Sequence, residues 1–135
     1  MDHNMFCFQC EQTAGCTGCT SRGVCGKDAQ TAQVQDRLTG ALIGLARAAD
    51  TSPDAGPETW QLMIEGLFAT LTNVNFDPDS LNALAGRVRA EKQRLVPDCA
   101  VCTAPCGRTG DYDLAQLWGA QEDIRSLKSL LLFGS

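Results

Sequence analysis

The chain has 135 residues, a length that suits one domain with a modest core. Its formal net charge is −5 and it has no lysine- or arginine-rich cluster, which argues against nucleic acid as a partner. No apolar run approaches the roughly 20 residues that a membrane span needs, so we expect no membrane partner either.

Residues 1–30 are predicted to form a loop rich in cysteine and glycine. Five of the eight cysteines lie between Cys7 and Cys25. Cysteines at this density indicate either disulfides or metal ligation. No secretion signal is visible before them, and the helical stretches that follow can form a core without disulfide staples. We therefore expect a cytoplasmic protein whose thiols bind a metal or a metal cluster, with disulfides as the less favoured alternative.

The first cysteine cluster consists of Cys7, Cys10, Cys19 and Cys25, with the spacing C-x2-C-x8-C-x5-C. Four thiolates suit either tetrahedral zinc or a cubane [4Fe–4S] cluster. Structural zinc usually pairs two short knuckles, whereas these gaps of eight and five residues suit a wider centre. The spacing therefore favours an iron–sulfur cluster, and a zinc-binding interaction module remains an alternative.

Glycines and two cations accompany these four cysteines. The glycines allow backbone N–H groups to turn toward the inorganic sulfides of a cluster, and such hydrogen bonds raise its reduction potential. Arg22 and Lys27 either offset the negative charge of the site or are ordinary solvated side chains. The sequence leaves both interpretations open for the two cations. The glycines are Gly15, Gly18, Gly23 and Gly26.

Residues 31–95 predict three helices. Apolar residues such as Val34, Leu38 and Leu45 recur at helical spacing in residues 31–50. Gly40 and Gly44 lie one turn apart in this helix, where another backbone or a cofactor can approach closely; tight helix packing is the favoured alternative.

A turn at residues 51–57 precedes the second helix, in which Pro57 suits the first turn. Its apolar stripe is predicted to be core. The third helix is expected to begin with Asp77 as N-cap and Pro78 at the first helical position. Its charged residues are expected to form a solvated face, and docking of a partner by some of them is the alternative. The stripe of the second helix comprises Trp60, Met63, Ile64, Leu67, Phe68 and Leu71.

A second cysteine loop is predicted at residues 96–113, with Cys99, Cys102 and Cys106. Three thiols cannot complete four-fold ligation, but Cys16 could supply the fourth ligand of a second iron–sulfur cluster. The favoured alternative is that the three are free thiols or form a redox-dependent disulfide. Zinc, or a cluster completed by another part of the protein, is the remaining interpretation.

Residues 114–135 predict a short helix at Leu114–Trp118 and a last helix from about Gln121. The last helix ends in the apolar run Leu130–Phe133, a face that needs a partner. With helices throughout and no convincing strand, the sequence predicts an all-α fold: one small helical bundle with an N-terminal cysteine-rich loop.

The segment MFCFQCEQTAGCTGCTSRGVCGK, residues 5–27, resembles the N-terminus of the hybrid-cluster proteins, also called prismane proteins or hydroxylamine reductases. The resemblance continues through residues 31–46, 66–77 and 122–134. It implies that Cys7, Cys10, Cys19 and Cys25 ligate a [4Fe–4S] cluster that receives electrons from a redox partner protein. It also implies that the whole enzyme reduces hydroxylamine or nitric oxide at a hybrid iron–sulfur–oxygen cluster.

The chain departs from that family in length. Members are several times longer and ligate the hybrid cluster with His, Glu and Cys residues of later domains, whereas the only histidine here is His3. We therefore expect an electron-transfer domain with no catalytic residues of its own. Its expected partners are the remaining domains or a second copy bound through the last helix. A stand-alone ferredoxin-like electron carrier or redox sensor is the alternative.

Overall fold

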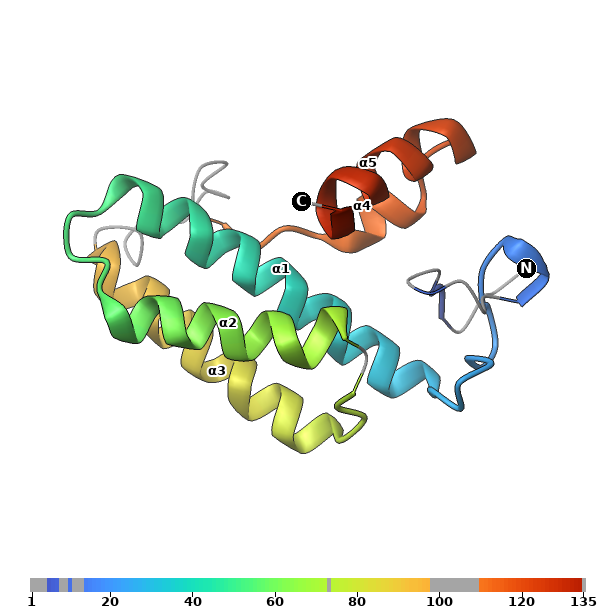
Figure 1. Ribbon diagram of the computed structural model, residues 1–135, viewed down its shortest axis with the longest axis horizontal. Coiled ribbons are helices and arrows are strands. Elements are labelled where there is room, and N and C mark those ends of the chain that lie inside the picture. The colour runs from blue at the N-terminus through green and yellow to red at the C-terminus, as the bar shows by residue number, and fades with distance from the viewer. Residues whose placement is uncertain (1–4, 8–9, 11–13, 73, 98–109, 135) are drawn as a thin grey trace.

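Helices account for nearly all of the regular structure in the part of the chain that can be described. The computed structural model describes the chain except residues 1–4, 8–9, 11–13, 73, 98–109 and 135 (Figure 1). Over the described ranges it contains no strand, and an isolated bridge between Cys7 and Cys19 is the nearest approach to one. The predicted all-α fold is confirmed. The elements are η1 Ala14–Cys16, α1 Ala29–Thr51, α2 Pro57–Leu71, α3 Pro78–Leu95, α4 Leu114–Trp118 and α5 Glu122–Gly134.

The helix boundaries follow from local chemistry. Asp28 caps α1 by accepting a hydrogen bond from the Thr31 N–H at 2.7 Å. Asp77 caps α3 in the same way, with Pro78 at the first helical position, as the sequence predicted. Pro57 opens α2. Proline loses nothing there because its missing N–H would have no partner within the helix.

The core is built around α1, which packs against both α3 and α2 (Figure 1). Aliphatic side chains of α1 and α3 are completely buried between the two helices; they include Leu38, Leu45, Leu81 and Val88. Helix α2 approaches α1 closely at Gly66, where an added Cβ would lie 2.6 Å from the Leu42 side chain. The three long helices therefore share one apolar interior. None of the described helices is long and apolar enough to cross a membrane.

The predicted orientation of α2 is wrong. The side chains expected in the core mostly face outward: Trp60 is 48% exposed, Ile64 67% and Phe68 61%. The buried face instead carries smaller residues, because small side chains allow α2 to lie close to α1. Two of them are threonines whose hydroxyl groups are satisfied by hydrogen bonds to Glu91 and to a backbone carbonyl. The buried residues of α2 are Thr59, Leu62, Gly66, Ala69 and Thr70.

Residues 111–113 cross α1 and attach α4 to the bundle. The Tyr112 N–H donates to the Gly40 carbonyl at 3.1 Å, and a Cβ on Gly40 would lie only 2.1 Å from the Tyr112 carbonyl oxygen. Asp111 accepts from Arg89 at 2.9 Å and from Lys92 at 2.6 Å, both on α3. The close approach expected at Gly40 is thus made by the backbone of a connecting segment, and the favoured alternative of helix packing is wrong there.

Candidate metal centre

The cysteine loop is closed by a pair of facing residues. The Cys7 N–H donates to the Cys19 carbonyl at 3.0 Å, and the Cys19 N–H donates to the Cys7 carbonyl at 2.8 Å. A third bond, from the Met5 N–H to the Thr20 carbonyl at 3.3 Å, extends the pair. Facing residues of an antiparallel pair project their side chains to the same side. Two predicted ligands that are distant in sequence are thereby neighbours.

Glycines shape the turns between the cysteines. Gly15, Gly18 and Gly26 have positive φ angles of 59°, 132° and 92°, a backbone region that other residues rarely adopt. The turn after Ala14 directs its backbone N–H at the Cys19 sulfur, 3.5 Å away. The predicted hydrogen bonds to the inorganic sulfides of a cluster stay a prediction. An N–H group directed at a thiolate stabilises its negative charge.

The two cations beside the cysteines have different environments. Lys27 is only 1% exposed, and its Nζ donates to the Cys7 sulfur at 3.6 Å. Its ammonium also lies 5.9 Å from the centre of the Phe76 ring. Arg22 is exposed. Ordinary solvation therefore describes Arg22 and not Lys27.

The four predicted ligands do not converge in this structure. Cys19 is buried and Cys7 partly buried, while Cys10 and Cys25 are exposed. Among the described residues, no three Cys, His, Asp or Glu side chains are grouped as they would be around a metal ion. The donor set nevertheless fits an iron–sulfur cluster chemically, because it offers thiols whose sulfur atoms receive N–H and ammonium hydrogen bonds.

The second cysteine cluster cannot be placed. Cys99, Cys102 and Cys106 lie outside the described residues, as does His3, and Cys16 is the last residue of η1. A second cluster, a zinc site and free or disulfide-bonded thiols therefore all stay predictions.

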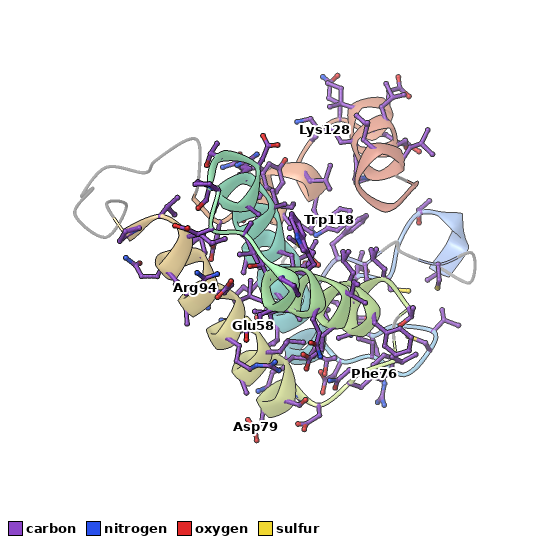
Figure 2. The ribbon with its side chains drawn as sticks, turned by 60° about the vertical axis from the view of Figure 1, so that its left-hand side comes forward. Glu58, Phe76, Asp79, Arg94, Trp118 and Lys128 are labelled. Atoms are coloured by element: carbon purple, nitrogen blue, oxygen red, sulfur yellow. The ribbon has the colours of Figure 1, made fainter. Side chains whose placement is uncertain are left out.

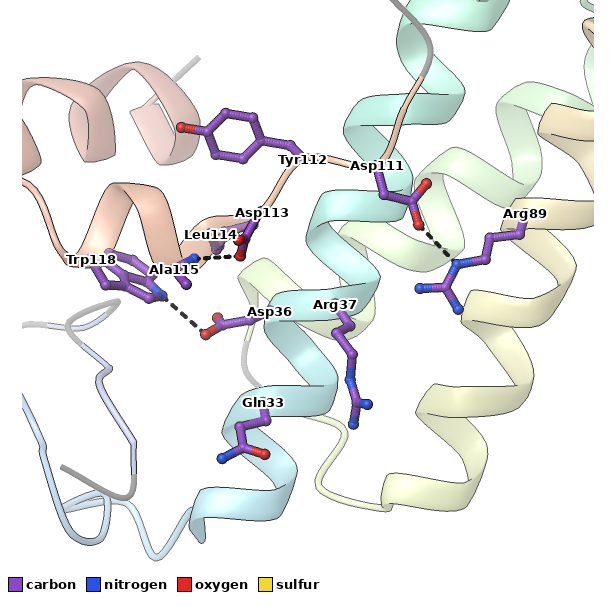
Figure 3. Close-up of a pocket in the computed structure, with 10 residues that line it drawn as sticks. All are labelled: Gln33, Asp36, Arg37, Arg89, Asp111, Tyr112, Asp113, Leu114, Ala115 and Trp118. Carbon is purple, nitrogen blue, oxygen red and sulfur yellow. Dashed lines mark hydrogen bonds and ion pairs between the residues drawn. The ribbon is translucent and has the colours of Figure 1, made fainter. Parts of the chain in front are cut away.

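An aromatic contact that the sequence did not predict links the cysteine loop to the helices. Phe6, next to Cys7, packs against Trp118 of α4 with ring centres 5.4 Å apart, and the Arg125 guanidinium of α5 lies 4.7 Å from the Phe6 ring centre. The Trp118 indole N–H donates to Asp36 of α1 at 3.0 Å (Figure 3). In the sequence, the position of Phe6 next to Cys7 is the one hint of this contact.

Asp36 is the most perturbed acid near this contact. Its burial raises the pKa to about 6, although the hydrogen bond from Trp118 and the positive charge of Lys27 oppose the shift. Asp36 also lines a cleft of about 420 Å³ between α1, α3 and residues 111–118 (Figure 3). Arg37 and Arg89 lie on the same cleft, and Arg89 is paired with Asp111.

Comparison with known proteins places the chain in a family. The sequence model of the Prismane/CO dehydrogenase family matches residues 5–135, which include both cysteine clusters. The chain belongs to this family. Membership implies iron–sulfur ligation, in agreement with the donor set of the cysteine loop.

Similar proteins include several named as hydroxylamine reductase. The protein of that name from Clostridium perfringens is 38% identical over 152 residues, which cover 97% of this chain and 28% of the relative. Those from Maridesulfovibrio salexigens and Kosmotoga olearia are 37% and 35% identical and cover 96% and 97% of this chain. The chain thus spans 27–28% of the length of these curated relatives.

Proposed function

We propose that this chain is the electron-transfer part of a hydroxylamine reductase. In this proposal Cys7, Cys10, Cys19 and Cys25 hold a [4Fe–4S] cluster. The cluster receives electrons from a redox partner protein, and the rest of the enzyme uses them to reduce hydroxylamine or nitric oxide. The observation that carries the proposal is the pairing of Cys7 with Cys19 beside the buried Lys27, in a chain of this family.

The residues of the loop have defined tasks in this proposal. A bound [4Fe–4S] cluster takes up and releases one electron at a time. The Cys7–Cys19 pair fixes two of the ligands, while the exposed Cys10 and Cys25 have room to close around the metal. The Ala14 N–H and the Lys27 ammonium stabilise the negative charge of the sulfur atoms.

Catalysis is assigned to the part of the enzyme that the chain does not span. The relatives named hydroxylamine reductase are more than three times as long as their matched segments. A hybrid iron–sulfur–oxygen cluster, with its His, Glu and Cys ligands, belongs to that remainder. We therefore assign no catalytic residue within this chain.

Metal analysis of anaerobically purified protein tests the cluster. We expect iron and sulfide in the amounts of one [4Fe–4S] cluster per chain and an EPR signal that develops on reduction. Cys10→Ser should lower iron content and alter that signal, whereas Ser21→Ala, a matched change on the same loop, should leave both unchanged. Zinc without iron, or a folded and colourless protein, would refute the proposal. A second cluster held by Cys16, Cys99, Cys102 and Cys106 would double the iron content.

The exposed apolar face of α5 supports a contact with the rest of the enzyme. Leu127, Leu130 and Leu131 are between 65% and 73% exposed, and Ile124 of the same helix is 45% exposed. Surfaces of this kind usually mark an interaction site. Size-exclusion chromatography distinguishes the alternatives: association of the chain through α5 supports a truncated enzyme, and a monodisperse monomer supports a stand-alone electron carrier.

A further inference from the structure

We propose that Lys27 is the charge-compensating residue of the iron–sulfur site and raises its reduction potential. The proposal rests on the proposed function, because it needs a cluster bound at Cys7. Lys27 is a long cationic side chain that is only 1% exposed, and its ammonium is in contact with the sulfur of a predicted ligand at 3.6 Å.

Burial strengthens the electrostatic effect of the Lys27 charge and makes the charge unfavourable unless it is compensated. Moving an ammonium group out of water is strongly unfavourable unless an opposite charge or hydrogen bonds compensate it. A thiolate at Cys7 supplies such a charge, and the face of the Phe76 ring lies 5.9 Å away. Because water screens little in such a place, Lys27 acts on the site more strongly than an exposed cation at a similar distance.

The backbone holds Lys27 between two ligands. The Gly23 N–H donates to the Lys27 carbonyl at 2.7 Å. A Cβ added to Gly23 would lie 3.0 Å from the Lys27 Cβ and 3.1 Å from the Cys25 sulfur, so both groups crowd the same point. The next residue, Asp28, caps α1 and fixes the chain there. The Lys27 backbone thus closes the turn that contains Cys25, and its ammonium reaches the Cys7 sulfur.

The segment that contains Phe76 is attached to α1. The Thr31 hydroxyl donates to the Phe76 carbonyl at 3.4 Å, and the Gln35 amide donates to the Asn75 carbonyl at 2.8 Å. Figure 2 shows Phe76 near the end of α3 that faces the cysteine loop. These bonds fix the connection between α2 and α3 against α1, and with it the Phe76 ring beside the ammonium.

A fixed positive charge favours the reduced state. A four-thiolate cluster is already negative, and it becomes more negative by one charge when it accepts an electron from a reductant such as the partner protein or dithionite. The Lys27 ammonium stabilises that added charge without any bond being made or broken. The net charge around a cluster is one of the main determinants of its potential.

The experiment compares midpoint potentials in the cluster-containing chain by mediated redox titration followed by EPR. We expect Lys27→Met to shift the equilibrium toward the oxidised form by at least tenfold, which is 59 mV for a one-electron couple. Lys27→Arg keeps the charge, so its midpoint potential should lie close to that of the wild type. Arg22→Met is the matched control, because it removes an exposed cation from the same loop, and should change the equilibrium less than threefold.

Iron and sulfide content separates the outcomes. If Lys27→Met retains a full cluster at an unchanged potential, the role of Lys27 is refuted while the proposed function stands. If the wild-type chain binds no iron, both are refuted. If Lys27→Met loses the cluster, Phe76→Ala decides, because it keeps the charge but opens Lys27 to water. Phe76→Ala should lower the potential and make the potential depend on ionic strength. If the potential of Phe76→Ala equals that of the wild type and does not change with ionic strength, the role of Lys27 is refuted.

Discussion

The helical bundle and the cysteine loop are held together by different interactions. In the bundle, α1 is enclosed by aliphatic side chains of α2 and α3, and residues such as Leu38 and Leu81 are completely buried. Around the loop, the buried apolar group is small and consists of Met5 and Cys19 of the loop and Ala32 of α1. The loop depends instead on the Cys7–Cys19 backbone pair and a few polar and aromatic contacts.

This difference indicates that the cysteine loop, rather than the helical bundle, needs a bound metal or cluster. Burial of aliphatic side chains is the main source of folding free energy, and of the two apolar clusters the larger lies in the bundle. The loop contains glycines, whose ordering costs backbone entropy, and a buried lysine, whose charge is unfavourable without compensation. Substitutions in the bundle should therefore change unfolding, while those in the loop should change metal binding.

The largest effect on stability is expected for Leu38→Ala in the centre of α1. Leu38 is fully buried, and removal of such a side chain from a packed core lowers the free energy of unfolding by about 2–5 kcal/mol. Urea unfolding followed by circular dichroism measures the change. A loss below about 1 kcal/mol would contradict the view that the bundle is held by its aliphatic core.

Asp36, where α4 meets α1, should make stability depend on pH. Burial raises its folded pKa from 3.8 to about 6, so the folded state retains a proton that the unfolded state has lost. This group therefore favours the folded state at low pH, and that contribution falls as the pH rises from about 4 to about 6. The loss reaches about 3 kcal/mol at most, at about 1.4 kcal/mol per pKa unit.

Asp36→Asn tests this pH dependence because it keeps a carbonyl oxygen for the Trp118 N–H and removes the charge. The free energy of unfolding of the variant, measured in urea across that range, should fall less with rising pH than that of the wild type. Asp50→Asn, on the exposed side of the same helix, is the matched control and should stay within about 0.5 kcal/mol of the wild type. Parallel curves for wild type and Asp36→Asn would contradict the assignment.

Gly40→Ala should weaken the attachment of α4 to the bundle. The added methyl group would lie 2.1 Å from the Tyr112 carbonyl oxygen, and neither backbone can move without breaking the hydrogen bond between the two residues. Overpacking of this kind costs about 1–3 kcal/mol. Gly86→Ala on α3, where nothing lies within 4 Å, should instead stabilise the protein by about 0.5–1 kcal/mol. Equal effects of the two substitutions would show that the close contact at Gly40 is unimportant.

Features encoded by neighbouring residues were predictable from the sequence. The N-cap Asp77, the prolines at positions 57 and 78 and the breaks between helices act within one turn, and the structure has them as expected. The ligand set that the cysteine spacing indicates stays a prediction; within the described ranges, the structure pairs the backbones of Cys7 and Cys19.

Features that depend on distant residues were not predictable. Phe6 and Trp118 are far apart in sequence, and nothing local indicates that they meet. Arg22 and Lys27 are both cations beside cysteines, but only the tertiary fold buries one of them. Helix α2 has apolar residues on two faces, and periodicity cannot decide which of them packs inward.

The smallest effect on the free energy of unfolding is expected for a substitution on the outward face of α2. Such a substitution tests whether burial, rather than hydrophobicity alone, decides what a side chain contributes to stability. Ile64 is 67% exposed, so Ile64→Ala should change the free energy of unfolding by less than about 0.5 kcal/mol. Leu62, two residues earlier and 8% exposed, is the matched control, and Leu62→Ala should cost about 2–5 kcal/mol in the same urea experiment. A large loss at Ile64 in the isolated chain would mean that this face packs inward, as the sequence suggested. A small loss there with a large one at Leu62 would show that the face of α2 that contains Leu62 supplies its contact with the bundle.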